Sequence, residues 1–82
     1  MYRVLIRYSF NGDDGGVTTD FWNGLSSLGF HDAGTGLKRA DGLSAFQLED
    51  FFSLLGSHGH GMTTAAGVPV TVDHFIVIVE TV

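Results

Sequence analysis

The chain has no cysteine among its 82 residues. Without thiols it can form neither a disulfide nor a thiolate nucleophile or metal ligand. Basic residues are also scarce, because four Lys and Arg stand against nine Asp and Glu, giving a formal net charge of −5. Nucleic-acid-binding domains draw most of their affinity from Lys and Arg at phosphates, so we expect no direct binding to nucleic acid. The acidity is compatible with a basic protein partner, a metal ion or simple solubility.

Long apolar runs are missing too, since none approaches the ~20 residues that cross a membrane. The N-terminus alternates instead of following the charged-then-apolar order of a signal peptide. We therefore expect no membrane association and a location in the cytoplasm, or in the host-cell cytoplasm if a phage encodes the chain. Apolar material is nevertheless plentiful, because 44% of the residues are hydrophobic, including seven Phe, two Tyr and one Trp. This is enough for the core of one domain, expected to span residues 1–82.

Two predicted strands frame the chain. Strict alternation over Tyr2–Phe10 predicts a half-buried first strand. One of its faces is apolar throughout and consists of Tyr2, Val4, Ile6, Tyr8 and Phe10. The last strand is predicted at about residues 74–82, where five successive apolar residues begin at Phe75. Apolar residues on both of its faces indicate a central or covered strand.

Helical periodicity predicts a first helix after the first strand. We expect Thr18 or Thr19 to cap its start, and Gly29 followed by Phe30 to form its C-terminal cap. Gly24, inside this helix, indicates a close approach to the sheet. The buried stripe is expected to consist of Phe21, Leu25 and Leu28, with Trp22 at its edge.

A second helix is predicted from a capping box. Ser44 and Gln47 have the spacing at which each side chain bonds the other residue's backbone, and Gly56 is expected to end the helix. Its apolar stripe is predicted to be Leu48, Phe51, Phe52 and Leu55.

Between the helices, a turn at Gly34-Thr35-Gly36 predicts a hairpin with strands at His31–Ala33 and Leu37–Ala40. A further small hairpin is expected around Ala66-Gly67. The main order is then strand, helix, two strands, helix, strand. Right-handed crossovers and short connections make the ferredoxin-like βαββαβ sandwich, an α+β fold with two helices on one face of an antiparallel sheet, the simplest closure. The first and last strands become neighbours in that sheet.

The face of the sheet without helices is one candidate functional surface. If the apolar side of the first strand faces the helices, aliphatic residues of both framing strands are left uncovered. On the last strand, either Phe75, Val77 and Val79 or Ile76 and Ile78 must face outward. The candidate interface residues are Arg3, Leu5, Arg7, Ile76 and Ile78. Contiguous apolar surface usually marks an interface, so we expect homodimerisation through this face. The alternative is that residues 57–71 cover it.

The end of the sheet that carries long loops is the second candidate. In this topology the connections 11–16, 33–36 and 57–71 leave the sheet at the same end, and loops on a rigid scaffold commonly carry function. Carboxylates and imidazoles together are ligands for a divalent metal such as Mn or Zn. The candidate metal ligands there are Asp13, Asp14, His58 and His60. Simple solvation of these side chains is the alternative, in which case the chain has no cofactor.

The element order and the aspartates after the first strand resemble, loosely, the small ferredoxin-like nucleases associated with CRISPR loci and their toxin relatives. In that family the metal-binding aspartate lies at the end of the first strand, where this chain has Tyr8-Ser9-Phe10. Asp13 and Asp14 come several residues later, so the resemblance covers the architecture and not the motif.

Two hypotheses for function follow. The first is a small, acidic, non-enzymatic protein-interaction module that binds a larger protein, for example one that handles nucleic acid. It would be a regulator or inhibitor of the kind that phages and mobile elements encode. It follows from the acidity, the small size, the lack of a catalytic motif such as G-x-S-x-G and the apolar sheet face. The second is a small metal-dependent phosphodiesterase or nuclease-like enzyme with its Asp and His site at the loop-rich end.

Overall fold

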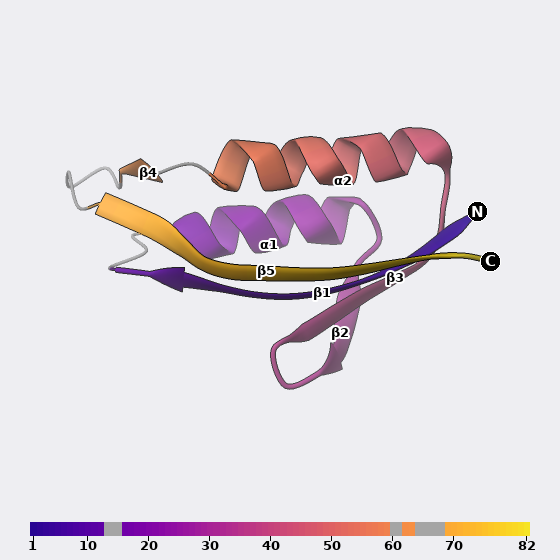
Figure 1. Cartoon of the computed structure of the whole chain (residues 1–82), viewed down its shortest axis with the longest axis horizontal. Coiled ribbons are helices and arrows are strands. Elements are labelled where there is room, and N and C mark those ends of the chain that lie inside the picture. Colours follow the sequence, from indigo (N-terminus) through magenta and orange to yellow (C-terminus); the bar gives the residue numbers. More distant parts are fainter. Residues whose placement is uncertain (13–15, 60–61, 64–68) are drawn as a thin grey trace.

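The computed structural model describes residues 1–12, 16–59, 62–63 and 69–82. Figure 1 shows two helices stacked on one side of a sheet whose other side is bare of helices. Both chain ends lie at the same corner, where the Val82 amide donates to the Met1 carbonyl at 3.0 Å. The elements follow in the order β1 (Tyr2–Asn11), α1 (Val17–Ser27), β2 (His31–Gly34), β3 (Leu37–Leu43), α2 (Ala45–His58), β4 (Met62–Thr63) and β5 (Pro69–Thr81).

The strands form one sheet in the order β2-β3-β1-β5-β4, and every neighbouring pair is antiparallel. Without the short β4, this is the predicted ferredoxin-like βαββαβ arrangement. The small extra hairpin is also present, since Met62 pairs with Val70 and Thr63 with Pro69. Its expected turn, Ala66-Gly67, lies outside the described residues.

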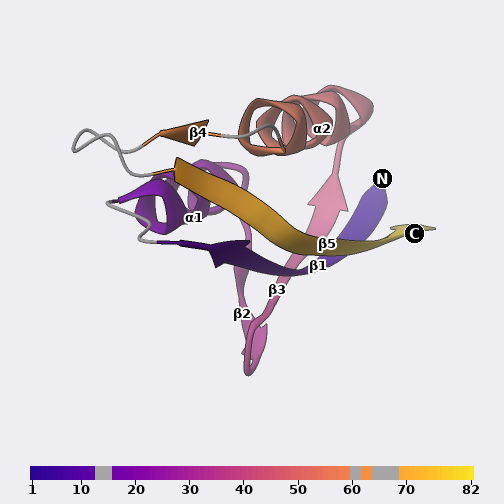
Figure 2. The same ribbon diagram turned by 60° about the vertical axis from the view of Figure 1, so that its left-hand side comes forward.

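The framing strands are neighbours, as predicted, and β1 and β5 form the long ribbon across the middle of Figure 2. Their pairing runs from Tyr2 opposite Thr81 to Asn11 opposite Thr71, and it absorbs one extra residue of β5 at a bulge beside Ser9. The last strand therefore begins at Pro69 and not near His74. Bulges of this kind let a strand continue past an irregular position.

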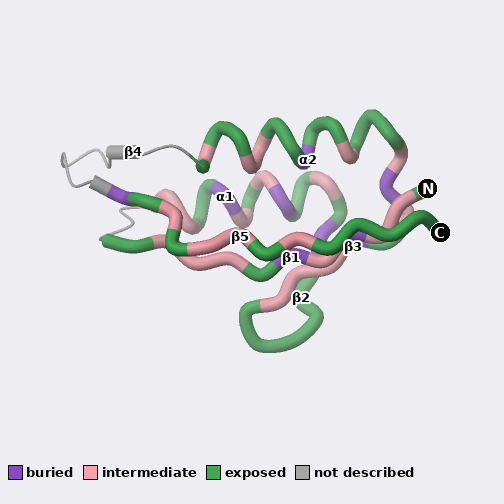
Figure 3. Tube along the Cα trace, in the orientation of Figure 1, coloured by how far each residue is buried: buried purple, intermediate pink, exposed green. Residues whose placement is uncertain are grey.

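The core lies between the sheet and the helices, as the alternation of β1 predicts. Val4 and Ile6 are fully buried, together with Phe21 and Leu25 of α1 and Phe51 of α2. In Figure 3 the buried segments follow the layer between helices and sheet. Aromatic rings fill much of this layer, with the ring of Phe21 lying within 4.7–5.6 Å, centre to centre, of Tyr8, Phe10, His58 and Phe75.

The start of α1 differs from the prediction. The cap residue is Gly16, in the left-handed region with φ of 104°, and the helix begins at Val17 before either threonine. The Asp20 amide already donates to the Gly16 carbonyl at 2.8 Å. A glycine takes up this backbone conformation without steric cost, so the chain enters the helix earlier than a threonine cap would allow.

The end of α1 agrees with the prediction. Gly29 has φ of 93°, the Phe30 amide donates to the Leu25 carbonyl and the Gly29 amide donates to the Ser26 carbonyl. These two bonds define a Schellman motif, and buried Phe30 supplies its hydrophobic contact.

Gly24 does permit a close approach, but to the other helix and not to the sheet. A Cβ at Gly24 would lie 2.7 Å from a methyl carbon of Leu54 in α2. The missing side chain thus lets α1 and α2 pack closely together. This contact also explains why Leu54 faces inward.

The capping box of α2 is present as predicted. The Ser44 hydroxyl accepts from the Gln47 amide at 3.2 Å, and the Gln47 side chain accepts from the Ser44 amide at 2.9 Å. The end of the helix was predicted wrongly, because α2 continues through Gly56 to His58. Phe52 was also assigned wrongly to the buried stripe, and 49% of it is exposed. Leu54, turned towards α1, takes its place in the packing.

Replacing Ser44 with alanine should lower the free energy of unfolding by about 1 kcal/mol, because two backbone donors at the start of α2 depend on this residue pair. Urea titration followed by circular dichroism measures the change. Ser53→Ala, at an exposed position inside the same helix, is the matched control and should stay within about 0.5 kcal/mol of the native chain. Equal effects of the two changes would contradict the importance of the cap.

Candidate functional site

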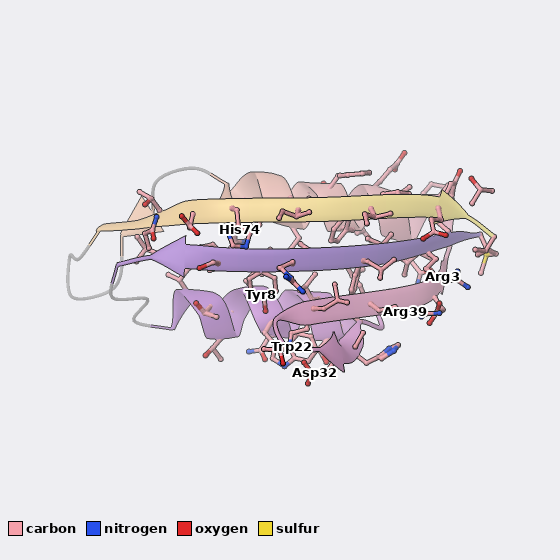
Figure 4. All side chains as sticks on the ribbon, turned by 60° about the horizontal axis from the view of Figure 1, so that its bottom comes forward. Arg3, Tyr8, Trp22, Asp32, Arg39 and His74 are labelled. Carbon is pink, nitrogen blue, oxygen red and sulfur yellow. The ribbon has the colours of Figure 1, made fainter. Side chains whose placement is uncertain are left out.

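The predicted interface residues come together on the helix-free face of the sheet. Figure 4 views this face, with β5 and β1 crossing in front of both helices. Because directly opposed residues of an antiparallel pair point to the same side, the register of β1 and β5 groups them in rows. Arg3 lies opposite Glu80, Leu5 opposite Ile78 and Arg7 opposite Ile76.

The register also decides which face of β5 points outward. Ile76 and Ile78 are 56% and 54% exposed, whereas Phe75 and Val77 pack against the core on the helix side. Two large aliphatic side chains of β5 are therefore left in contact with solvent, and the cover that was expected over both faces of this strand is missing among the described residues.

These residues line a shallow depression of about 270 Å³, together with Leu37 of β3. Its full lining is Leu5, Arg7, Leu37, Ile76 and Ile78. Leu37 was missed by the sequence reasoning because its place beside Arg7 depends on the register between β1 and β3. The depression is an apolar surface with one cation at its rim.

Arg7 supplies that cation. It is exposed and forms no ion pair within the part of the chain that the structure describes. The other two arginines of the face are engaged by carboxylates. Arg7 is thus available to a carboxylate from outside the chain.

One end of the face carries a charged cluster around Asp41. A bulge in the pairing of β1 with β3 inserts an extra residue here, and Gly42, with φ of 73°, takes the left-handed conformation at this bulge. Asp41 accepts from Arg3 at 2.9 Å and from Arg39 at 3.0 Å, and Arg3 also lies 3.7 Å from Glu80. The hydrogen bonds from Arg39 and then Arg3 lower the pKa of Asp41. The hydrogen bond to Asp41 raises the pKa of Arg39.

A second polar group lies on the helix side, beside the β2–β3 hairpin. Lys38 forms an ion pair with Asp32, and its Nζ sits 4.4 Å from the centre of the Trp22 ring in α1. Burial raises the pKa of the nearby Tyr8 phenol, an effect that Lys38 opposes and Asp32 adds to. The Lys38 ammonium therefore joins β3 to β2 through the ion pair and holds the hairpin against α1 through the face of the indole ring.

The metal-site prediction stays a prediction for most of its residues, since Asp13, Asp14 and His60 lie outside the described residues. His58, the fourth, is the last residue of α2. Its Nδ1 lies 3.1 Å from the Leu54 carbonyl and 3.0 Å from the Ser57 hydroxyl, and its ring packs 5.2 Å from that of Phe21. Within residues 1–12, 16–59, 62–63 and 69–82, no three His, Asp or Glu side chains gather closely enough to hold a metal ion.

The expected gathering of three loops at one end is only partly present. The β2–β3 turn begins next to Leu37, which pairs with Arg7, whereas β1 continues four residues farther to Asn11. At about 3.4 Å per residue, the hairpin turn stops roughly 13 Å short of the other two connections. Figure 1 shows the hairpin ending well before the far ends of β1 and β5.

His74 and Asp73 lie at the bulge of β5. His74 Nδ1 and the Asp73 carboxylate are 2.9 Å apart, which joins the two neighbouring side chains. The His74 Nε2 is buried and has no hydrogen-bond partner among the described residues. The sequence analysis did not predict this contact between the two neighbouring side chains.

Neither helix of the described chain has the length and apolarity needed to cross a membrane. Comparisons with family models, curated proteins and solved structures return no significant match to this chain.

Proposed function

We propose that this chain is a non-enzymatic protein-interaction module that binds a larger protein through the helix-free face of its sheet. The apolar depression lined by Leu5, Leu37, Ile76 and Ile78 is the observation that carries the proposal. Large aliphatic side chains that share one exposed surface are characteristic of protein-binding sites.

The shape of the depression favours a protein partner over a small molecule. Its volume of about 270 Å³ is below the range of about 300–1,000 Å³ typical of small-molecule sites, and it is open along the sheet. The partner chemistry that fits is an apolar protrusion with a carboxylate beside it. The protrusion would fill the depression and the carboxylate would pair with Arg7.

Nucleic acid fits the same face poorly. Single-stranded RNA needs aromatic side chains for stacking and free cations for phosphates. The outward residues that the structure describes on β1, β3 and β5 include no Phe, Tyr or Trp, and Arg3 and Arg39 are held by Asp41. With a net charge of −5, the chain is better suited to regulate or inhibit a protein that handles nucleic acid than to bind nucleic acid itself.

Arg7→Glu should abolish partner binding, because it reverses the charge at the rim of the depression and leaves the core residues untouched. The experiment is affinity capture from a lysate of the source organism, with the native chain and the variant compared by quantitative mass spectrometry. Phe46→Glu is the matched control, because Phe46 is 80% exposed on α2, on the helix side of the molecule.

A protein that is retained by the native chain and by Phe46→Glu, and lost with Arg7→Glu, is the expected result. A protein retained equally by all three would place the binding surface elsewhere. Capture of nothing above background by the native chain would remove the support for the proposal.

A further inference from the structure

Among the residues that the structure describes, strand β5 has an open edge along most of its length. From Thr71 to Thr81 it pairs with β1 on one side, while on the other side the described part of β4 covers only Pro69 and Val70. Such an edge presents a row of backbone donors and acceptors without strand partners and is a template for pairing with another strand.

The middle of this edge lacks the features that usually keep edge strands from pairing. Natural edge strands are guarded by charges, prolines or bulges. In β5 these occur only towards the ends, as Pro69, the bulge at Asp73 and Glu80. The five residues of Phe75–Val79 between them are all apolar.

The exposure of Val79 shows that apolar side chains of β5 are accessible on both faces of the sheet along this edge. Val79 lies opposite the fully buried Val4, on the helix side of the sheet, yet it is 40% exposed. On the outer side Ile76 and Ile78 are more than half exposed. The apolar surface of β5 therefore wraps around its edge and is not limited to the outer face.

We infer that a second copy of this chain pairs antiparallel along the edge of β5, with the two-fold axis at Val77. In an antiparallel pair, two opposed residues point to the same face of the sheet, whereas neighbouring residues of one strand point to opposite faces. The two-fold axis of a symmetric pair therefore passes through one residue position and cannot fall between two. With Val77 on the axis, Ile76 lies opposite Ile78 of the second copy, and Phe75 lies opposite its Val79.

The same register also matches polar residues. His74 then lies opposite Glu80 of the second copy, so neither of these polar side chains faces an apolar residue across the pair. Moving the axis to residue 78 would put Glu80 opposite Ile76, and moving it to residue 76 would put His74 opposite Ile78. Only the axis at Val77 keeps all of 75–79 against apolar partners.

Pairing along the edge is also more favourable for Arg7 than packing two sheets face to face, because the guanidinium keeps its contact with water. A face-to-face pair would bury Arg7, while the carboxylates on that face already bind Arg3 and Arg39. The edge pair leaves Arg7 in solvent and joins β1, β2, β3 and β5 of both copies into one eight-stranded sheet. The depressions then lie on one continuous face, with Ile76 and Ile78 of both copies at its centre.

The inference goes beyond the partner-binding proposal and is tested without the partner. Opposed residues of an antiparallel pair have Cα atoms about 4.5–5.5 Å apart, within the roughly 4.4–6.8 Å that a disulfide spans. Val77→Cys, in a chain with no other cysteine, should therefore form a disulfide-linked dimer under mild oxidation. The control, Phe46→Cys on the exposed side of α2, should stay monomeric on a non-reducing gel.

Val79→Lys is the second variant, because a lysine at this exposed position blunts the edge without altering the outer face. It should weaken dimerisation at least about tenfold in sedimentation velocity with an unchanged circular dichroism spectrum. Phe46→Lys is its control and should dimerise like the native chain.

Three outcomes would overturn the inference. One is a native chain that stays monomeric by light scattering at high micromolar concentration. Another is a Val79→Lys variant that dimerises as strongly as the native chain. The third is a pair of results: a short bismaleimide cross-links Leu5→Cys, on the outer face, while Val77→Cys forms no disulfide. This pair would point to face-to-face packing. None of these depends on whether Arg7→Glu loses the larger partner.

Discussion

Replacing Phe21 with alanine should lower the free energy of unfolding by about 3–5 kcal/mol and leave much of the chain unfolded at room temperature. The Phe21 ring is fully buried and contacts rings from β1, α2 and β5. Natural domains hold only about 0.05–0.15 kcal/mol of stability per residue. The cavity left by the Phe21 ring therefore removes a large part of the total free energy of unfolding of an 82-residue chain.

Guanidinium titration followed by circular dichroism measures this effect. Phe52→Ala is the matched control, since the Phe52 side chain is 49% exposed and leaves no enclosed cavity. It should change the stability by less than about 1 kcal/mol. A Phe21→Ala variant as stable as Phe52→Ala would mean that the aromatic cluster does not hold the sheet to the helices.

Two neighbouring residues of β1 should respond oppositely to the same substitution. Ile6→Asp should prevent folding, because the side chain is fully buried and a carboxylate there has no partner, a change worth several kcal/mol. Leu5→Asp should leave the fold intact, because Leu5 points to the open face and its carboxylate stays in water. Arg7, two residues along on the same face, would further favour the new charge.

Thermal unfolding followed by circular dichroism separates the two variants. We expect no cooperative transition for Ile6→Asp and a near-native one for Leu5→Asp. If Leu5→Asp unfolded as well, a covering segment would have to lie on the outer face. A folded Leu5→Asp protein is in addition a second reagent for the partner-binding experiment, because it places a charge at the centre of the depression.

Local chemistry explains which parts of the fold were predictable. The alternation of β1, the capping box at Ser44 and the Gly29-Phe30 cap depend on residues close together in the sequence, so their patterns are complete in the chain itself. The outward residues of β1 were predictable from its alternation, whereas the choice of Ile76 and Ile78 as the outward residues of β5 needed the register between the two strands.

The errors occur where distant contacts outweigh a local signal. Gly56 is a reasonable stop signal, but α2 continues because His58, beyond it, packs on Phe21. Phe52 fits the apolar periodicity as well as Leu54 does, and the close approach at Gly24 selects Leu54. The position of Lys38 over Trp22 depends on the fold as a whole, so no spacing in the sequence signals it.

The meeting of the two chain ends has a mechanical consequence. Met1 and Val82 lie at the same corner, at one end of the long β1–β5 ribbon. Tension applied between the ends would pull the two strands apart crosswise and load their hydrogen bonds one pair at a time. The sheet would open like a zipper at low force, whereas a chain with its ends at opposite corners would have to shear the whole ladder at once.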